Sequence, residues 1–199
     1  MEQTKMGRPR EFDADDALEK ALLVFWEHGY EGASLSLLTE EMGISRKSMY
    51  AAFGNKEDLF LKALQRYEQG PGSYVRDSVG AATAREVAET FLYGAVAAGT
   101  QPGRPPGCLG VRAALAVGVT GATVQEILTA WRAQRHVDLR ERFERALADG
   151  DLPEGSDPDL IARYLTTVAD GVSVQATEGA SRESLRSVVD ASMRHWPPM

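Results

Sequence analysis

The chain has 199 residues, 43% of them hydrophobic and 26% charged, as is ordinary for a globular protein of one or two domains. Its formal net charge of −7 argues against bulk affinity for nucleic acid, and its single cysteine excludes an intramolecular disulfide. No apolar run reaches the roughly 18 residues of a membrane span, and the N-terminus has no apolar signal region. We therefore expect a cytoplasmic protein with no membrane partner.

Residues 1–10 are predicted to form a flexible basic arm. In Gly7-Arg8-Pro9-Arg10, the side chains of Arg8 and Arg10 could enter a narrow, A·T-rich minor groove, as homeodomain arms do. The alternative is a disordered tail that makes no DNA contact. Asp13 then caps a first predicted helix, which runs to about His28 along an apolar stripe and ends at Gly29.

Residues 34–60, SLSLLTEEMGISRKSMYAAFGNKEDLF, are the most informative stretch. They predict a short helix capped by Ser34 or Ser36 and ended by Gly43, and a second helix capped by Ser45. A third helix follows Asn55 and runs to about residue 69. This order is typical of a helix-turn-helix, whose second helix lies in the DNA major groove.

The predicted DNA contacts are polar or basic residues at the two helix starts and in the arm. The first turn of the second helix would meet base edges and phosphates, and a lysine at the next helix N-terminus would bind a phosphate. Read one by one, the bases are more typical of a solvated face, and a lone tyrosine is more typical of half-buried packing. The predicted DNA-binding residues are Arg8, Arg10, Ser34, Ser45, Arg46, Lys47, Ser48, Tyr50 and Lys56.

Charge in this region is local. Residues 1–66 hold nine Lys and Arg against twelve Asp and Glu, so the DNA-binding part is itself acidic. The acids gather in the first helix and at Glu40–Glu41, whereas the bases gather in the arm and around Arg46, Lys47 and Lys56. A small basic face on an acidic protein limits non-specific DNA binding and suits a site-selective regulator.

Residues 11–67 resemble the N-terminal DNA-binding domain of the TetR family of bacterial one-component transcriptional regulators. Many relatives carry aromatic or histidine residues where this chain has Ala51 and Ala52, so we expect one phosphate contact to be missing and the affinity for DNA to be lower. The resemblance rests on four segments in the family's order and spacing: Phe12 with Ala17, Leu18, Ala21 and Phe25; Gly29-Tyr30; Gly43-Ile44-Ser45; and Tyr50, Phe53, Lys56, Glu57, Leu59 and Phe60.

Beyond the break at Gly70-Pro71-Gly72 the pattern stays helical and no alternating strand pattern appears. The expected fold is all-α: a three-helix helix-turn-helix domain and a linking helix over residues 11–69, then a C-terminal ligand-binding and dimerisation bundle over residues 70–199. Helices are predicted at 83–100, 107–118, 121–149, 157–179 and 181–196, which makes about nine in the whole chain.

The last two predicted helices carry more apolar residues than one buried face can hold, which indicates that a second face packs against another surface. The resemblance implies a homodimer in which this helix pair meets its symmetry mate; packing within one chain is the alternative for part of the set. The predicted interface residues are Leu160, Tyr164, Val168, Val172, Leu185, Val188, Val189 and Met193.

The resemblance also implies a small-molecule effector bound among the central helices. Residues of this kind at helical spacing are more typical of plain core than of a pocket, and Arg112 could pair with a neighbouring carboxylate instead of an acidic ligand. Cys108 lies near a predicted helix start, where a thiolate is favoured, so a redox- or electrophile-sensing regulator is a second reading beside an inert buried thiol. The predicted ligand-binding residues are Phe91, Cys108, Arg112, Trp131, His136 and Tyr164.

Other classes of function find little support in the sequence. No catalytic or phosphate-binding motif is present, and the three histidines lack the spacing of a metal site, so we expect no enzyme, no metal and no cofactor. An architectural DNA-binding protein would be basic and would not need a large second domain. The expected function is a dimeric transcriptional regulator that binds a palindromic operator in double-stranded DNA and is released by an effector. Activation instead of repression stays open.

Overall fold

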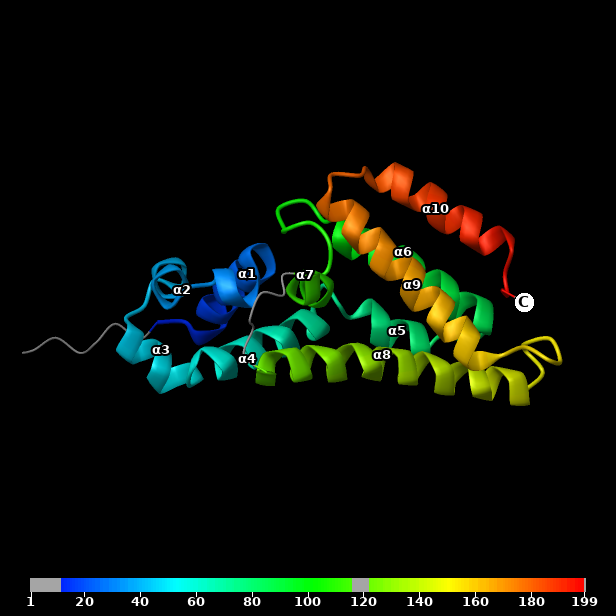
Figure 1. Ribbon diagram of the computed structural model, residues 1–199, viewed down its shortest axis with the longest axis horizontal. Coiled ribbons are helices and arrows are strands. Elements are labelled where there is room, and N and C mark those ends of the chain that lie inside the picture. The colour runs from blue at the N-terminus through cyan, green and yellow to red at the C-terminus, as the bar shows by residue number, and fades with distance from the viewer. Residues whose placement is uncertain (1–11, 116–121, 199) are drawn as a thin grey trace, which may run out of the picture.

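The computed structural model describes residues 12–115 and 122–198, and over these ranges it contains ten α-helices and no β-strand (Figure 1). The predicted all-α fold is confirmed. Arg8 and Arg10, the two predicted contacts of the arm, lie outside the described residues. No described helix combines the length and the apolar composition needed to cross a membrane.

Four helices form the N-terminal head: α1 (Ala14–Gly32), α2 (Leu35–Met42), α3 (Arg46–Phe53) and α4 (Lys56–Gln69). Each begins at the predicted cap. The Ser34 hydroxyl accepts from the Leu37 amide at 3.1 Å, and the Ser45 hydroxyl accepts from the Ser48 amide at 3.1 Å. Such a cap typically stabilises a helix by about 1 kcal/mol.

Glycine ends two of these helices as predicted. Gly43, at φ 68°, takes the left-handed conformation and turns the chain from α2 into α3. Gly29, also at φ 68°, interrupts α1 one residue after the predicted end, and one more helical turn carries the chain to Gly32.

Six helices follow: α5 (Tyr74–Val79), α6 (Ala84–Gly99), α7 (Leu109–Leu115), α8 (Ala122–Ala148), α9 (Pro158–Thr177) and α10 (Arg182–Arg194). The prediction of nine helices missed α5, which has only six residues and no capping side chain. It is held by tertiary packing: a Cβ on Gly94 of α6 would lie 2.4 Å from the Tyr74 Cβ, so α5 and α6 touch where α6 has no side chain.

Two apolar cores divide the molecule, and α8 extends from one to the other. The first joins α1–α4 to α7 and the beginning of α8, whereas the second joins α6, α9 and α10 to the rest of α8. With 27 residues, α8 is about 40 Å long, and in Figure 1 it runs from below the end of α4 to the far end of the bundle. The head therefore shares a core with helices that follow residue 70 in sequence; the domain boundary at that residue stays a prediction.

Candidate nucleic-acid interface and effector pocket

The second helix of the head presents a small polar surface. Met49 and Phe53 of α3 are buried in the head core, which leaves Arg46, Lys47 and Tyr50 exposed on the opposite side. Tyr50, 47% exposed, is one of three large hydrophobic side chains with high exposure in the described part of the chain. Ala51 and Ala52 are exposed beside it. The exposed face thus carries two cations, one phenol and two methyl groups.

Hydrogen bonds tie this face to its surroundings. The Arg46 guanidinium donates from Nη2 to the Ser36 hydroxyl of α2 at 2.7 Å, so its direction is set from the neighbouring helix. The Ser45 and Ser48 hydroxyls lie 2.9 Å apart at the helix start. The first turn of α3 is ordered before any ligand arrives.

Lys56 has a different neighbourhood from the other predicted contacts. Its ammonium lies 4.4 Å from the centroid of the Tyr30 ring, a cation–π arrangement. Burial lowers its pKa, and Glu31 acts in the opposite direction. Because the ammonium stands over an aromatic face at the N-terminus of α4, its position is fixed by packing with the end of α1.

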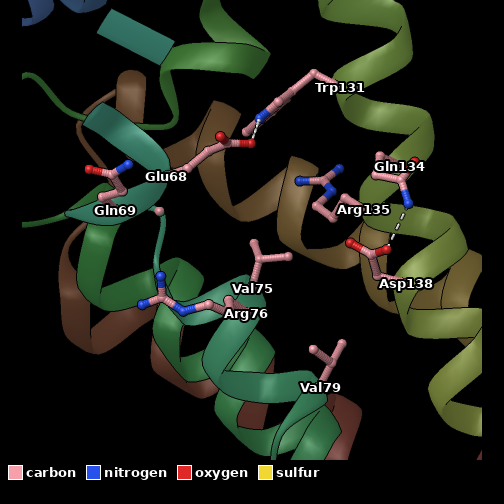
Figure 2. A pocket seen from close by; sticks show the side chains of 10 residues that line it. Glu68, Gln69, Val75, Arg76, Val79, Trp131, Gln134, Arg135 and Asp138 are labelled. Carbon is pink, nitrogen blue, oxygen red and sulfur yellow. Dashed lines mark hydrogen bonds between the residues drawn. The ribbon is translucent and has the colours of Figure 1, made fainter. Parts of the chain in front are cut away.

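A cavity of about 330 Å³ lies where the end of α4 and the start of α5 face the middle of α8 (Figure 2). Most of the surface that lines it is apolar, although six of the ten lining residues are polar or charged. The Trp131 indole N–H donates to the Glu68 carboxylate at 2.5 Å, which joins α8 to α4 across the cavity. The lining residues are Glu68, Gln69, Gly72, Val75, Arg76, Val79, Trp131, Gln134, Arg135 and Asp138.

Arg135 is the most buried charged residue of this wall, with 5% exposure. Its Nη2 donates to the Asp170 carboxylate at 2.7 Å, and its guanidinium stands 5.9 Å from the Phe91 ring centroid. Burial opposes the charged form, but Asp170 outweighs it and raises the pKa of Arg135. Among residues 12–115 and 122–198, neither its Nε–H nor the buried hydroxyl of Tyr67 has a hydrogen-bond partner.

Two tyrosines lie close to this arginine. Burial, with Cys108 as the next cause, raises the pKa of the Tyr67 hydroxyl well above its ordinary value, and the same two causes raise that of Tyr74. Both hydroxyls therefore stay protonated at physiological pH, where each can donate and accept a hydrogen bond.

Among the predicted ligand-binding residues, Trp131 alone lines this cavity. Phe91 is fully buried and packs on the Tyr74 ring, with centroids 5.7 Å apart. Tyr164 is partly buried against the second core. Cys108 is 6% exposed, and its amide donates to the Ser173 hydroxyl at 2.7 Å. A reagent would have little access to this thiol, so the redox-sensing alternative is not favoured.

Arg112 holds two backbone carbonyls instead of the anion that its charge led us to expect. It donates to the Glu27 carbonyl of α1 at 2.7 Å and to the Pro106 carbonyl at 3.4 Å. Nearby, Arg104 pairs with Glu19 of α1, and Arg66 of α4 pairs with the same carboxylate at 2.6 Å. The loop before α7 is thus fastened to α1 through Arg104, and α7 itself through Arg112.

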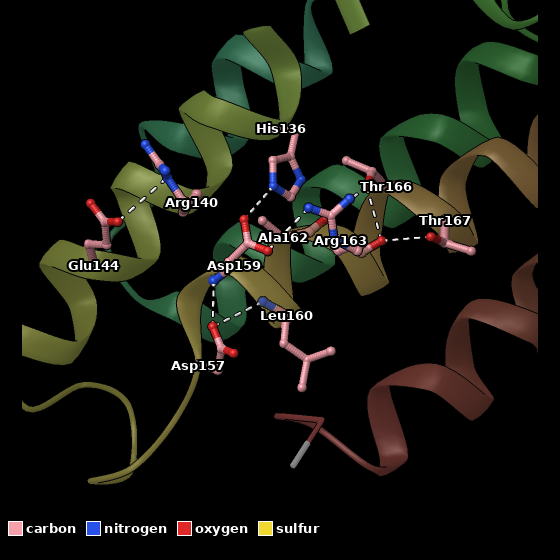
Figure 3. Close-up of polar contacts among 10 residues, drawn as sticks. All are labelled: His136, Arg140, Glu144, Asp157, Asp159, Leu160, Ala162, Arg163, Thr166 and Thr167. Carbon is pink, nitrogen blue, oxygen red and sulfur yellow. Dashed lines mark hydrogen bonds and ion pairs between the residues drawn. The ribbon is translucent and has the colours of Figure 1, made fainter. Parts of the chain in front are cut away.

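His136 takes part in a polar cluster between α8 and α9 (Figure 3). Its Nε2 lies 2.8 Å from the Asp159 carboxylate, which also accepts from Arg163 at 3.2 Å. Within residues 12–115 and 122–198, no three His, Cys, Asp or Glu side chains gather in a way that could hold a metal ion.

The predicted interface residues of α9 and α10 divide into two groups. Leu160 and Val188 are 46% and 50% exposed, and Tyr164 and Val168 are partly exposed. The other four face inward and belong to the intrachain core, so we reassign them from the interface to that core: Val172, Leu185, Val189 and Met193.

The sequence predicted an effector site among the central helices and named Trp131, but it did not identify the other residues that line the cavity. The cavity is lined by α5, which sequence patterns missed, and by α8, which has no continuous apolar stripe. Arg135 and Tyr67 lie within predicted helices, and nothing in the sequence indicates that their polar groups are buried. The small, turn-rich Gly70–Gly72 segment was the one available signal that chain direction changes there.

A capped α2, a left-handed glycine turn and an α3 with an exposed basic start define a helix-turn-helix protein. The family model described as "Bacterial regulatory proteins, tetR family" matches residues 17–63. The HTH-type transcriptional repressor ComR of Escherichia coli (strain K12) is 31% identical over 195 residues, which cover 97% of this chain and 93% of ComR. The chain belongs to the TetR family.

Other relatives agree. The HTH-type transcriptional repressor AcnR of Corynebacterium efficiens is 31% identical over 88% of this chain and 87% of its own. Among solved structures, a cysteine mutant of the TetR family transcriptional regulator CifR, complexed with 26-bp double-strand operator DNA, is 46% identical. It covers 96% of this chain and 100% of its own, with a TM-score of 0.88. The expected class, a helix-turn-helix transcriptional regulator, is confirmed.

Proposed function

We propose that this protein represses transcription by binding a roughly palindromic operator as a homodimer, and that a small-molecule effector releases it. The observation that carries the proposal is the similarity over nearly the whole chain to a regulator solved on operator DNA. ComR and AcnR, both repressors, extend it. An architectural DNA-binding role is not favoured beside these relatives.

In this proposal α3 enters the major groove with its exposed side. Arg46 and Lys47 contact base edges or phosphates, and the Tyr50 hydroxyl donates to a phosphate. The capping residues Ser34 and Ser45, with Ser48, contact the sugar-phosphate backbone of the DNA near the helix starts. Lys56 adds positive charge at the start of α4. Arg8 and Arg10 enter the adjoining minor groove.

The exposed side of α9 and α10 is the proposed dimer interface. Leu160, Tyr164, Val168 and Val188 offer apolar surface that the chain itself leaves uncovered. A two-fold axis there would present two α3 helices to successive major grooves, about 34 Å apart, which requires a palindromic site.

The effector would occupy the cavity beside the C-terminal end of α4. The helix α4 also packs in the head core. A shift at Glu68, near the end of α4, would therefore move α3 relative to the α3 of the second protomer. A coupling of about 1–3 kcal/mol is enough for a useful switch. We place the protein in the cytoplasm with its DNA and propose no enzymatic activity, because its relatives are regulators.

A gel shift with the DNA upstream of the protein's own gene tests the proposal. The native protein should retard this DNA at low salt, and Arg46→Ala/Lys47→Ala should weaken binding by at least about ten-fold. Arg85→Ala/Arg194→Ala removes the same charge from exposed sites on the bundle and should leave binding unchanged. No retardation by the native protein at low salt would contradict the proposal.

A further inference from the structure

The first side chain of α3 is held in place by the neighbouring helix. Sequence patterns left the cap of α2 open between Ser34 and Ser36, and in the structure Ser34 takes that role. The Ser36 hydroxyl is therefore free of the helix end, and it accepts a hydrogen bond from Nη2 of Arg46 at 2.7 Å. Both residues are exposed, so this bond lies on the open surface between the starts of α2 and α3.

The protein leaves the positive charge of Arg46 unmatched. In the described part of the chain Arg46 forms no ion pair, although α2 also carries Glu40 and Glu41. Arg66, in the same head, is instead bonded to the Glu19 carboxylate at 2.6 Å. A serine hydroxyl sets the direction of a guanidinium without neutralising it, so Arg46 keeps both its charge and a fixed direction for a partner outside the chain.

A guanidinium held in this way suits the edge of a base. Within the described residues it uses one of its five N–H groups on Ser36, and the others stay available. Guanine presents two acceptors, N7 and O6, side by side in the major groove, and a planar guanidinium can donate to both at once. The first residues of the second helix of a helix-turn-helix are the ones that meet base edges, and Arg46 is the first residue of α3.

A phosphate requires this arrangement less. It offers oxygens in several directions, so a lysine with no fixed position binds it as well. Lys47 is such a residue: it is exposed, and in the part of the chain that the structure describes its ammonium forms no ion pair. Holding an arginine before DNA arrives also reduces the rotational freedom that it loses on binding. The bond to Ser36 therefore favours recognition of one base by Arg46, whereas Lys47 suits contacts to the DNA backbone.

We propose that Arg46 recognises one guanine in each half of the operator, and that Ser36 is the positioning residue that directs its guanidinium to N7 and O6 of that base. This inference names a determinant of the operator sequence and therefore rests on the proposed function. Because a homodimer presents two copies of α3, the two guanines lie at positions related by the two-fold axis of the operator.

Binding sites are first selected by the full-length protein from duplexes of random sequence, which yields an operator whichever gene it controls. Each symmetric pair of guanines in the selected duplex is then replaced by 7-deazaguanine. This base still pairs with cytosine but carries C–H in place of N7, so it lacks one of the two acceptors. Gel shifts at low salt measure the affinity for the guanine duplex and for each 7-deazaguanine duplex, and the ratio of the two affinities isolates the contact to N7.

For one pair of guanines, the native protein should bind the guanine duplex about ten-fold more tightly than the 7-deazaguanine duplex. Arg46→Ala should bind both duplexes equally, although more weakly than the native protein does. Ser36→Ala should reduce the ratio to about three-fold or less, because the arginine loses its fixed direction. Ser36→Thr keeps a hydroxyl and should restore most of the native ratio. Alanine is a better helix former than serine, so the circular dichroism spectrum of Ser36→Ala should match that of the native protein.

Three results would overturn the inference: no guanine pair whose replacement weakens binding, a ratio that survives Arg46→Ala, or a ratio that Ser36→Ala leaves at its native value. In the last case an equal loss of affinity for both duplexes would mark Ser36 as a contact to the DNA backbone alone. The selection separates this inference from the proposed function. If no sequence is enriched, the protein binds no specific operator and both proposals fail, whereas an enriched sequence without such a guanine refutes this inference alone.

Discussion

Replacing Tyr67 by Phe should stabilise the protein, although it removes a polar group from the core. The Tyr67 side chain is 1% exposed, and its hydroxyl has no hydrogen-bond partner in the part of the chain that the structure describes. Its ring packs edge-on against Trp26 with centroids 5.0 Å apart, a contact that Phe keeps. Leaving a buried hydroxyl unpaired costs about 1–3 kcal/mol, so Tyr67→Phe should raise the free energy of unfolding by about 1 kcal/mol.

The matched control is Tyr93→Phe, where the same atom is removed from a paired hydroxyl. The Tyr93 hydroxyl donates to the Asp190 carboxylate at 2.6 Å, linking α6 to α10. This exchange should lower the free energy of unfolding by about 0.5–1 kcal/mol. Urea denaturation, followed by circular dichroism, measures both variants against the native protein. If Tyr67→Phe proves as destabilising as Tyr93→Phe, the hydroxyl has a partner and the reasoning about the buried donors fails.

Three further predictions concern the packing of the head and the bundle. Hydrogen bonds from Arg66 and Arg104 outweigh burial and lower the pKa of Glu19. The ionised Glu19 therefore stabilises the folded protein above the unfolded pKa of about 4.3. This stabilisation is lost as the pH falls through the lower pKa of the folded state. Urea denaturation should therefore show Glu19→Gln to be less stable than the native protein by about 1 kcal/mol at pH 7. This difference in the free energy of unfolding should shrink below pH 4, and a difference that does not change with pH would contradict the reasoning. Gly94→Ala would place a Cβ 2.4 Å from that of Tyr74 and force α5 from α6, at a cost of about 1–3 kcal/mol by thermal unfolding; an unchanged melting temperature would show that the contact yields. Leu160→Glu/Val188→Glu charges two exposed positions, so light scattering should find a folded monomer; a persistent dimer would place the interface elsewhere.

The head could be predicted from the sequence because its signals are local. A cap bonds to an amide three residues away, and a glycine adopts its own backbone angle. Ser34, Gly43, Ser45 and Asn55 therefore identify the helix ends without knowledge of the rest of the fold, and each has the predicted role in the structure. The stripe of α1 is likewise buried as its spacing predicts.

The bundle could be predicted only in part. Its long helices were found, but the side that each one buries depends on neighbours far away in sequence. Val189 and Val188 are adjacent and equally apolar, yet the first is fully buried and the second half exposed. Arg112 was expected to meet an anion and instead holds the carbonyl of Glu27, a residue distant in the chain.

The amino-acid sequence by itself determined where the helices of the head begin and end, which side of α3 is polar, and that the chain is an all-α regulator. These follow from capping, periodicity and backbone preference, each acting over a few residues. Only the tertiary structure decided that α7 and the start of α8 complete the head core, and that a cavity opens between α4, α5 and α8. It also placed the buried side chain of Arg135 beside that cavity. A cavity is space that several helices leave between them, so its shape is set by how those helices cross and not by the pattern of any one of them.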